Sequence, residues 1–255
     1  MSPDGYELGG KVAIVTGGSE GIGAATAQLL AFYGADVVIA GRTMETLEQT
    51  AESIARETGS RCLGVQADVC DEEQVRRLVA RTIEELGRID ILVNNVGWSS
   101  ASPLSEMPTD QWKNDFALNV DTAFFCAREV ARHFLAQGSG AIVNVSSIAG
   151  SNGTPGLAAY SSAKAAMQMF TRVAAAEWGP KGVRVNCVAP GLIATDNAMA
   201  YYEEVKLDID AVCSRFPLRR PGRPEEIARA IVFLACEASS YITGETIDIT
   251  GGPIM

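Results

Sequence analysis

Thr16-Gly17-Gly18-Ser19-Glu20-Gly21-Ile22-Gly23 is the stretch that decides the fold. It follows an apolar run and leads directly into a helix-forming segment rich in alanine and leucine. Gly17, Gly21 and Gly23 let the backbone turn tightly and approach a pyrophosphate, whose charge then faces a helix N-terminus. Such a loop between a strand and a helix, at the start of a βαβ unit, predicts a dinucleotide-binding site.

Outward from this loop, short β-branched runs alternate with longer amphipathic stretches. The runs are mostly continuous apolar segments, as expected for parallel strands that are covered on both faces. We predict strands at Lys11–Thr16, Asp36–Ala40, Arg61–Gln66, Ile89–Asn94, Ala141–Ser146, Arg184–Val188 and Thr246–Ile249. The alternation predicts an α/β chain with a single-domain Rossmann fold, in which a doubly wound seven-stranded parallel sheet carries helices on both faces.

The segments between these strands carry helical signals. Behind a predicted cap at Asp71, with Gln74 three residues on, apolar residues recur at i, i+3 and i+4 until Gly87 ends the helix. No linker or repeat divides the chain, so residues 1–255 are predicted to form one dinucleotide-binding domain. The irregular stretch 191–224 is predicted to be a substrate-loop insertion, because long loops of this kind often act as lids.

Composition excludes several classes of protein. The 255 residues include 31 acidic and 21 basic side chains, a formal charge of −10, which is unfavourable for binding nucleic acid. No apolar run reaches the ~20 residues that span a bilayer, and no secretory signal is recognised, so we expect a cytoplasmic protein without membrane contacts. One histidine, His133, and six cysteines without a C-x-x-C pair predict no metal site.

The end of the second predicted strand indicates which dinucleotide is bound. An acid there would bind the ribose 2′-hydroxyl of NAD, whereas an arginine accepts the 2′-phosphate of NADP. Gly41 takes the place of the acid and Arg42 follows it, which favours NADP(H). Glu20 in the glycine loop opposes a 2′-phosphate, so NAD(H) stays open as the alternative. Asp68 and Val69, after the third strand, are expected to hold the adenine.

Polar residues further along the chain form a candidate chemical centre. Tyr160 and Lys164 are spaced i, i+4 in a helical segment and therefore share one face. A fixed ammonium beside a phenol, whose free pKa is about 10, predicts a lowered tyrosine pKa and an acid–base residue usable near neutral pH. Ser147 ends the fifth strand, where its hydroxyl can bond a substrate oxygen. Asn119 is a polar residue in an otherwise apolar helix.

Taken together, these motifs resemble the short-chain dehydrogenase/reductase family. The resemblance runs from Lys11 to Gly252 and includes the glycine loop, the Asn-Asn-Val-Gly turn at 94–97, the Y-x-x-x-K pair and Pro190-Gly191 after the sixth strand. It implies hydride transfer between nicotinamide C4 and a carbonyl or secondary alcohol. Val96 replaces the alanine usual in this turn, and Glu20 stands where many NADP-preferring relatives carry a basic residue.

The resemblance assigns roles to four residues. Tyr160 is implied as the proton donor or acceptor, and Ser147 as the residue that orients the carbonyl or carbinol oxygen. Lys164 is implied to lower the tyrosine pKa and to bind the nicotinamide ribose, and Asn119 to hold a water in a proton relay. The predicted cofactor contacts are Gly17, Ser19, Gly21, Ile22, Gly23, Arg42, Asp68, Val69, Asn95, Gly97, Tyr160, Lys164, Pro190, Gly191, Ile193 and Thr195.

The substrate is predicted less closely. An apolar pocket favours a small-to-medium apolar ketone or alcohol, and its predicted lining is Trp98, Ser147, Leu157, Tyr160, Met199 and Tyr202, with Tyr201 also in the insertion. The alternatives are a 3-oxoacyl-thioester (ACP or CoA) reductase, whose nearest basic residues are Arg215, Arg219, Arg220 and Arg223, and a dinucleotide-binding protein without turnover. The intact Tyr160 and Lys164 argue against the latter. Lys164 and the glycine loop argue against halohydrin-cleaving lyases, which resemble this family but carry arginine in place of the lysine and lack the glycine loop.

The resemblance also implies a homotetramer. The predicted helices over Asp110–Gln137 and Leu157–Gly179 would pair across one interface, and the segment Gly244–Met255 across another.

Overall fold

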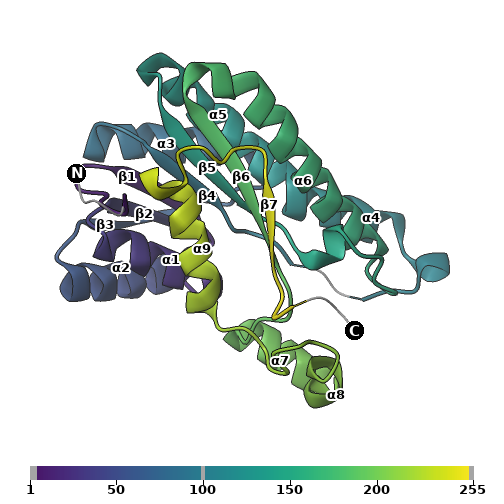
Figure 1. Ribbon diagram of the computed structural model, residues 1–255. Helices are drawn as coiled ribbons and strands as arrows, with labels where there is room; N and C mark the ends of the chain where they lie inside the picture. The colour runs from purple at the N-terminus through teal and green to yellow at the C-terminus, as the bar shows by residue number, and fades with distance from the viewer. Residues whose placement is uncertain (1–4, 99–100, 253–255) are drawn as a thin grey trace.

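A single parallel sheet runs through the computed structural model, which describes residues 5–98 and 101–252. Its strand order is β3-β2-β1-β4-β5-β6-β7, and every neighbouring pair is parallel (Figure 1). The strands are β1 Val12–Thr16, β2 Asp36–Gly41, β3 Cys62–Gln66, β4 Ile91–Asn94, β5 Gly140–Val145, β6 Val183–Pro190 and β7 Thr246–Ile249. All seven predicted strands are therefore confirmed, each to within two residues at either end.

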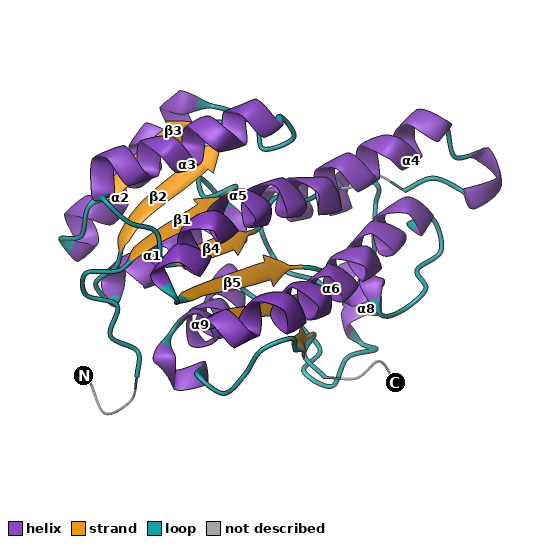
Figure 2. Ribbon diagram, turned by 90° about the horizontal axis from the view of Figure 1, so that it is seen from above, coloured by secondary structure: helices purple, strands orange, loops and turns teal. Residues whose placement is uncertain are grey.

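Helices cover both faces of this sheet. Helices α1, α2 and α9 pack on one face and α3, α5 and α6 on the other (Figure 2). Their bounds are α1 Gly21–Phe32, α2 Met44–Thr58, α3 Glu72–Leu86, α4 Thr109–Phe116, α5 Thr122–Gln137, α6 Ala158–Trp178, α7 Asp196–Glu204, α8 Ile209–Cys213 and α9 Pro224–Ala235. The predicted doubly wound Rossmann fold is thus confirmed.

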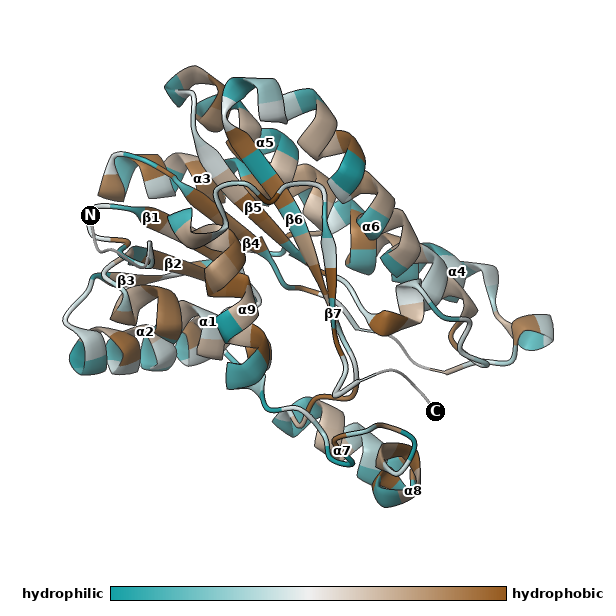
Figure 3. Cartoon of the chain, in the orientation of Figure 1, coloured by the Kyte–Doolittle hydropathy of each residue, from teal (hydrophilic) through white to brown (hydrophobic). Residues whose placement is uncertain are grey.

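Two apolar layers hold the helices to the sheet. Leu30 and Ile227 are fully buried on the side of α1 and α9, and Phe134 and Leu78 on the side of α5 and α3. Figure 3 shows the same pattern, with the most hydrophobic colouring along the central strands. Burying one such side chain stabilises the fold by ~1.5–3 kcal/mol, so these layers fix the framework on which the loops are mounted.

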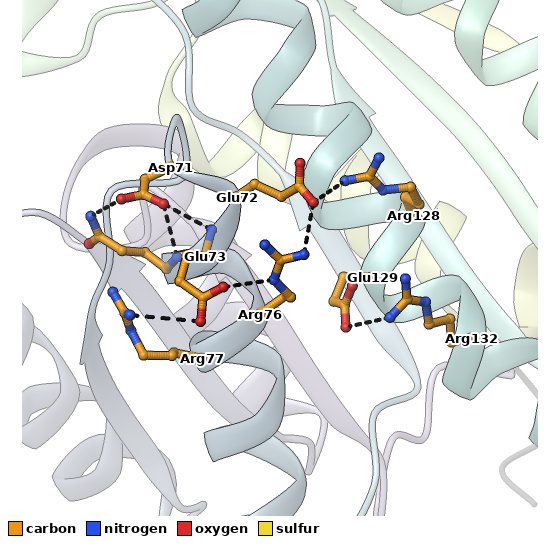
Figure 4. Close-up of polar contacts among 9 residues, drawn as sticks. Asp71, Glu72, Glu73, Arg76, Arg77, Arg128, Glu129 and Arg132 are labelled. Carbon is orange, nitrogen blue, oxygen red and sulfur yellow. Dashed lines mark hydrogen bonds and ion pairs between the residues drawn. The ribbon is translucent and has the colours of Figure 1, made fainter.

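Ion pairs add to the contact between α3 and α5 at the surface. The Asp71 side chain caps α3 as predicted, accepting from Glu73 N at 2.9 Å, and Gly87 ends the helix with φ 78°. Glu72 pairs with Arg128 of α5 at 2.8 Å and with Arg76 at 3.0 Å (Figure 4). Because these side chains are well exposed, the network contributes little to stability beside the apolar layers.

The helix predicted over Asp110–Gln137 contains a change of helix type. Between α4 and α5, residues Ala117–Asp121 form a π-helical turn. The side-chain amide of Asn119, in this turn, donates to Asp115 O at 2.9 Å, and this local bond competes with the regular helical ladder. The predicted helix therefore changes its hydrogen-bond pattern at this point but continues from α4 into α5, and Leu157–Gly179 corresponds to α6.

The sheet reverses its strand order between β1 and β4, so the loops that follow these strands part at their carboxyl ends. Ligands of open α/β sheets bind in the crevice at this point. The segment from residue 191 to 223, which contains α7 and α8, lies beyond the carboxyl end of β6 (Figure 1). Within the described residues, no helix has the length and apolar character needed to cross a bilayer.

Candidate active site

The glycine loop is closed too tightly for side chains. Gly17 and Gly21 have φ of 62° and 53°, a region that favours glycine, and a Cβ on Gly23 would overlap the carbonyl oxygen of Gly17. Glu20 at the N-cap of α1 makes no side-chain capping bond in the described part of the chain, so the first N–H groups of α1 remain free for another acceptor. The loop therefore fits a pyrophosphate at a helix N-terminus.

Asn95 joins the end of β4 to this loop. Its Nδ2 donates to the carbonyl oxygens of Thr16 and Gly17, both at 3.1 Å, and its backbone N–H donates to Thr16 Oγ1 at 3.0 Å. A Cβ on Gly17 would lie 3.2 Å from Val96 Cγ2, so the valine that replaces the usual alanine is accommodated beside glycine. The two sides of the crevice are thus held in fixed register.

The second strand and third strand place the residues predicted for the adenosine half. Arg42 follows β2 with an exposed side chain, and Glu20 is exposed as well. The Ser19 hydroxyl oxygen lies 3.8 Å from a Cβ built on Gly41. After β3, Asp68 accepts from Cys70 N at 3.0 Å through Oδ1. Val69, the next residue, is only 4% exposed and packs in the core layer on the side of α3, so its backbone rather than its side chain is left for the predicted adenine contact.

Lys164 lies at the centre of the site. It is 2% exposed, and its Nζ donates to Val145 O at 2.9 Å. A Cβ built on Gly97 would lie 2.7 Å from both Lys164 Nζ and Asn119 Oδ1, so a larger residue here would displace these side-chain ends, and both polar atoms adjoin this turn. Burial lowers the pKa of Lys164 to about 8.

Asn119 is fully buried rather than on a helix surface. Its Nδ2 donates to Trp98 O at 2.8 Å as well as to Asp115 O. Its Oδ1 has no hydrogen-bond partner among the residues that the structure describes, and it faces the space beside Gly97 and Lys164. The π-helical turn thus presents a buried acceptor to the centre of the site.

Tyr160 lies one turn before Lys164 on α6. The ammonium is 5.6 Å from the centre of the phenol ring, and Ser147 hydrogen-bonds to the tyrosine side chain. Burial raises the pKa of Tyr160, the Ser147 bond lowers it in part, and Tyr202 and Asp115 raise it further. The predicted lowering of this pKa is therefore wrong for the chain alone, because desolvation dominates and Lys164 is bonded to a backbone carbonyl.

Bonds between β5 and α6 keep Ser147 in place. Ser147 Oγ accepts from Ala149 N at 3.1 Å, and Gln168 Nε2 donates to Ser147 O at 3.3 Å. Ser146 Oγ donates to Lys164 O at 2.9 Å. These contacts hold the serine and the helix carrying Tyr160 and Lys164 in one fixed arrangement.

The loop after β6 reaches back to the glycine loop. Gly191 N donates to Ile249 O at 3.0 Å, directly after Pro190. Ile193 is 7% exposed, and Thr195 Cγ2 lies 3.1 Å from a Cβ built on Gly21. Of these predicted contacts of the nicotinamide half, Thr195 therefore adjoins the glycine loop.

An aromatic contact links the β4 turn to α7. The rings of Trp98 and Tyr201 meet edge to face at 5.4 Å, and Ala101 N donates to Tyr201 Oη at 3.4 Å. Tyr202 lies near enough to Tyr160 to affect its pKa. The sequence placed both Tyr201 and Tyr202 in the insertion as candidate pocket residues, but position in the sequence does not tell which of the two faces Trp98.

The positions of two further predicted pocket residues are known from the elements that carry them. Leu157 immediately precedes α6, and Met199 lies on α7 with 36% exposure. In the described parts of the chain, no group of histidine, cysteine or acidic side chains is arranged to hold a metal ion.

Comparison with known proteins shows which family shares this arrangement. A profile of the family described as Enoyl-(Acyl carrier protein) reductase matches residues 17–253. The chain is 40% identical to a 3-oxoacyl-[acyl-carrier-protein] reductase of Synechocystis sp. over 97% of its length and 98% of the relative's. It is 42% identical to cis-4-hydroxycyclohexanecarboxylate dehydrogenase of Sinomonas cyclohexanicum, covering 95% and 96%.

A solved structure agrees with these relatives. The crystallised 7α-hydroxysteroid dehydrogenase, complexed with NADH and 7-oxo glycochenodeoxycholic acid, superposes with a TM-score of 0.94 at 32% identity, covering 100% of this chain and 98% of its own. The motifs, the sheet and these similarities agree along the whole chain. It therefore belongs to the short-chain dehydrogenase/reductase family of oxidoreductases.

Proposed function

We propose that the protein is an NAD(P)(H)-dependent oxidoreductase that interconverts an apolar ketone and its secondary alcohol. The observation that carries the proposal is the buried Lys164, which lies between Tyr160 and Asn119 and against Gly97. Retaining a lysine in a site this dry costs stability, so its presence is best explained by chemistry. Gly97 and Asn95 connect this centre to the glycine loop.

In the proposed reaction, the glycine loop would hold the dinucleotide, whose nicotinamide would supply or accept the hydride. Ser147 Oγ donates a hydrogen bond that orients the substrate oxygen. The Tyr160 hydroxyl gives its proton to that oxygen during reduction, for which a raised pKa keeps the phenol protonated. The Lys164 cation stabilises the phenolate that remains, and Asn119 Oδ1 can accept a hydrogen bond from a water through which a proton from solvent returns to the phenolate.

The proposed cofactor is NADP(H). Support comes from Arg42, which follows β2 where no acid stands, and from its exposed side chain. Arg42→Ala is expected to weaken NADPH binding by more than about tenfold and to leave NADH nearly unchanged, because only the phosphate contact is lost. Titrations of protein fluorescence with each dinucleotide measure this. Equal losses for both would mean that Arg42 does not bind the phosphate.

The proposed substrate is uncharged and of small-to-medium size, bound under the insertion at 191–224. Trp98 and Tyr201 offer an aromatic wall. A 3-oxoacyl thioester is the second candidate, which the Synechocystis relative suggests. However, Arg220 and Arg223 both face Glu226, at 2.6 and 3.7 Å, and so are not free cations for a carrier phosphate.

Turnover with a panel of substrates decides between them. We expect NADPH oxidation, followed by its absorbance, with cyclic and short-chain ketones at higher kcat/KM than with a 3-oxoacyl thioester. The reverse order would favour the thioester reductase. Binding of neither dinucleotide would overturn the proposed function.

We also propose a homotetramer in the cytoplasm. Apolar side chains on α5 and α6 are 39–53% exposed, namely Phe124, Leu135 and Met169, as expected for a face that a second copy covers. The six free thiols favour a reducing compartment. Pro253–Met255, at the end of the other predicted interface segment, lie outside the described residues. Light scattering that gives a monomer mass would contradict the assembly.

A further inference from the structure

Arg220 and Glu226 form a two-pronged ion pair at the start of α9. Arg220 Nη1 donates to Glu226 Oε2 at 2.8 Å and Nη2 to Oε1 at 2.6 Å. The same carboxylate accepts from Arg223 N at 2.7 Å, which caps the helix. Chiefly through Arg220, the pKa of Glu226 falls to about 2, so the pair is fully charged at neutral pH.

Gly222 lies in the turn that this ion pair spans, and Glu226 Oε2 is 4.0 Å from a Cβ built on it. Gly222 forms a parallel bridge with Ile193: Ala194 N donates to Gly222 O at 2.8 Å, and Gly222 N donates to Leu192 O at 2.9 Å. A Cβ on Gly222 would lie 2.7 Å from Ile193 Cδ1, so the two segments are in close contact. Fixing the turn before α9 therefore also fixes the loop after β6.

That loop connects the lid with the dinucleotide cradle. Thr195 caps α7 by accepting from Ala198 N at 3.2 Å, and its methyl group adjoins Gly21 of the glycine loop. A displacement of Thr195 would alter both the start of α7 and the wall beside the pyrophosphate loop.

We propose that Arg220 is a positioning residue for the dinucleotide: through Glu226 and Gly222 it holds residues 192–195 in the conformation that the bound cofactor requires. This inference rests on the proposed dinucleotide function. Without the pair, the loop samples more conformations, and cofactor binding must then supply the free energy that orders it. Arg220 acts through the loop and does not touch the reacting atoms.

Two arginines on the same carboxylate provide a matched comparison. Arg220→Ala is expected to raise the Kd of the more tightly bound dinucleotide, NADPH or NADH, roughly three- to tenfold, with kcat at saturating cofactor within about twofold of wild type. Arg223→Ala removes the same charge but only a 3.7 Å contact, and should change Kd by less than about twofold. Protein fluorescence titration and steady-state kinetics give these values.

A double variant tests whether Arg220 acts through Glu226. Glu226→Gln should weaken binding to a similar extent, and Arg220→Ala with Glu226→Gln together no more than Arg220→Ala alone, because both remove one contact. Hydrogen exchange of the free protein adds a readout without cofactor: Arg220→Ala should speed exchange at the amides of Gly222 and Ala194, and Arg223→Ala should not.

Three results would decide against the inference. Unchanged Kd and exchange in Arg220→Ala would overturn it, as would equal effects of Arg220→Ala and Arg223→Ala, which would indicate a general charge effect. A fall in kcat at saturating cofactor with unchanged Kd would assign Arg220 to another step. If the wild type bound neither dinucleotide, the proposed function would fail first, and this inference with it.

Discussion

The glycine loop and helix α7 face the same crevice but are held in opposite ways. In the glycine loop, a single Cβ on Gly23 would overlap the backbone of Gly17. In α7, each of the nine residues, all of them described, is exposed or only partly buried. The first region is set by close backbone contacts, and the second by a few side-chain contacts such as Trp98 with Tyr201.

This difference determines how much of each region's chemistry can be recognised from its sequence. The cofactor half admits few residues at each position, so its chemistry is visible as a sequence motif. Little of α7 is buried, so we expect it to tolerate many residues, and in the proposed function the substrate could change there without unfolding the domain. We therefore expect substitutions in the two halves to have effects of different kind and size.

Lys164→Met should show the largest effect, since it removes the buried cation at the centre of the candidate site. Turnover is expected to fall at least ~1,000-fold, within the range known for acid–base groups. Burial lowers the pKa of Lys164 from 10.5 to about 8, which corresponds to ~3 kcal/mol at ~1.4 kcal/mol per pH unit. Met avoids this cost, so Tm should rise by about 6–12 °C at ~2–4 °C per kcal/mol.

Calorimetry and activity assays test this pair of effects, with exposed Lys181→Met as the control that should change neither. A lowered Tm in Lys164→Met would contradict the assignment of Lys164 as a costly group kept for catalysis.

Gly23→Val should disrupt the glycine loop through steric overlap alone. The added side chain overlaps Gly17 O, so the loop must open, and dinucleotide affinity is expected to fall more than ~100-fold or the chain to fold poorly. Ala200→Val, at an exposed position of α7, should leave affinity and Tm nearly unchanged. Similar losses in both variants would abolish the contrast between the two regions.

The pH dependence should report the buried lysine. Because the Lys164 pKa is about 8 and the Tyr160 pKa is raised, the cation is lost before the phenol ionises. Reductive kcat/KM should therefore fall about tenfold per pH unit above pH 8. The fold responds in the opposite direction: the unfolded chain holds this proton up to its pKa of 10.5, so the Lys164 contribution to stability rises from pH 8 to 10.5.

Rate profiles of wild type and Lys164→Arg, whose guanidinium stays charged, provide the check. A high-pH limb at the same position in both proteins would show that another group titrates.

Tyr201→Leu should have the smallest effect, and this effect should be limited to substrate binding. Loss of the ring contact with Trp98 is expected to raise KM for cyclic ketones about threefold to tenfold, with Tm and dinucleotide Kd unchanged. Fully exposed Tyr241→Leu is the matched control. A drop in Tm as large as that of a core substitution would mean that α7 is part of the framework.

The sequence predicted the parts of the fold that depend on local pattern. The strands appeared as apolar runs, and Asp71 and Gly87 marked the ends of α3. The π-helical turn at Asn119 was not predictable, because the side-chain bonds that accompany it, to Asp115 O and Trp98 O, form only in the folded chain. The raised pKa of Tyr160 also escaped prediction, since i, i+4 spacing reports the proximity of a lysine but not the extent of desolvation.

The substrate side was the least predictable. Whether Tyr201 or Tyr202 contacts Trp98 depends on the orientation of α7, which no sequence period fixes in a nine-residue helix with little buried surface. Likewise, the sequence offered Arg220 as a candidate cation for a phosphate, and only the structure places its guanidinium on Glu226.

The measurement that tests the central claim most directly is a paired determination of kcat and dinucleotide Kd for Tyr160→Phe. This substitution removes the transferable proton and keeps the ring that contacts Lys164. We predict that kcat falls at least ~1,000-fold while Kd stays within about twofold of wild type. A kcat within tenfold of wild type would contradict the role of Tyr160 as the proton donor, and with it the proposed chemistry of the site.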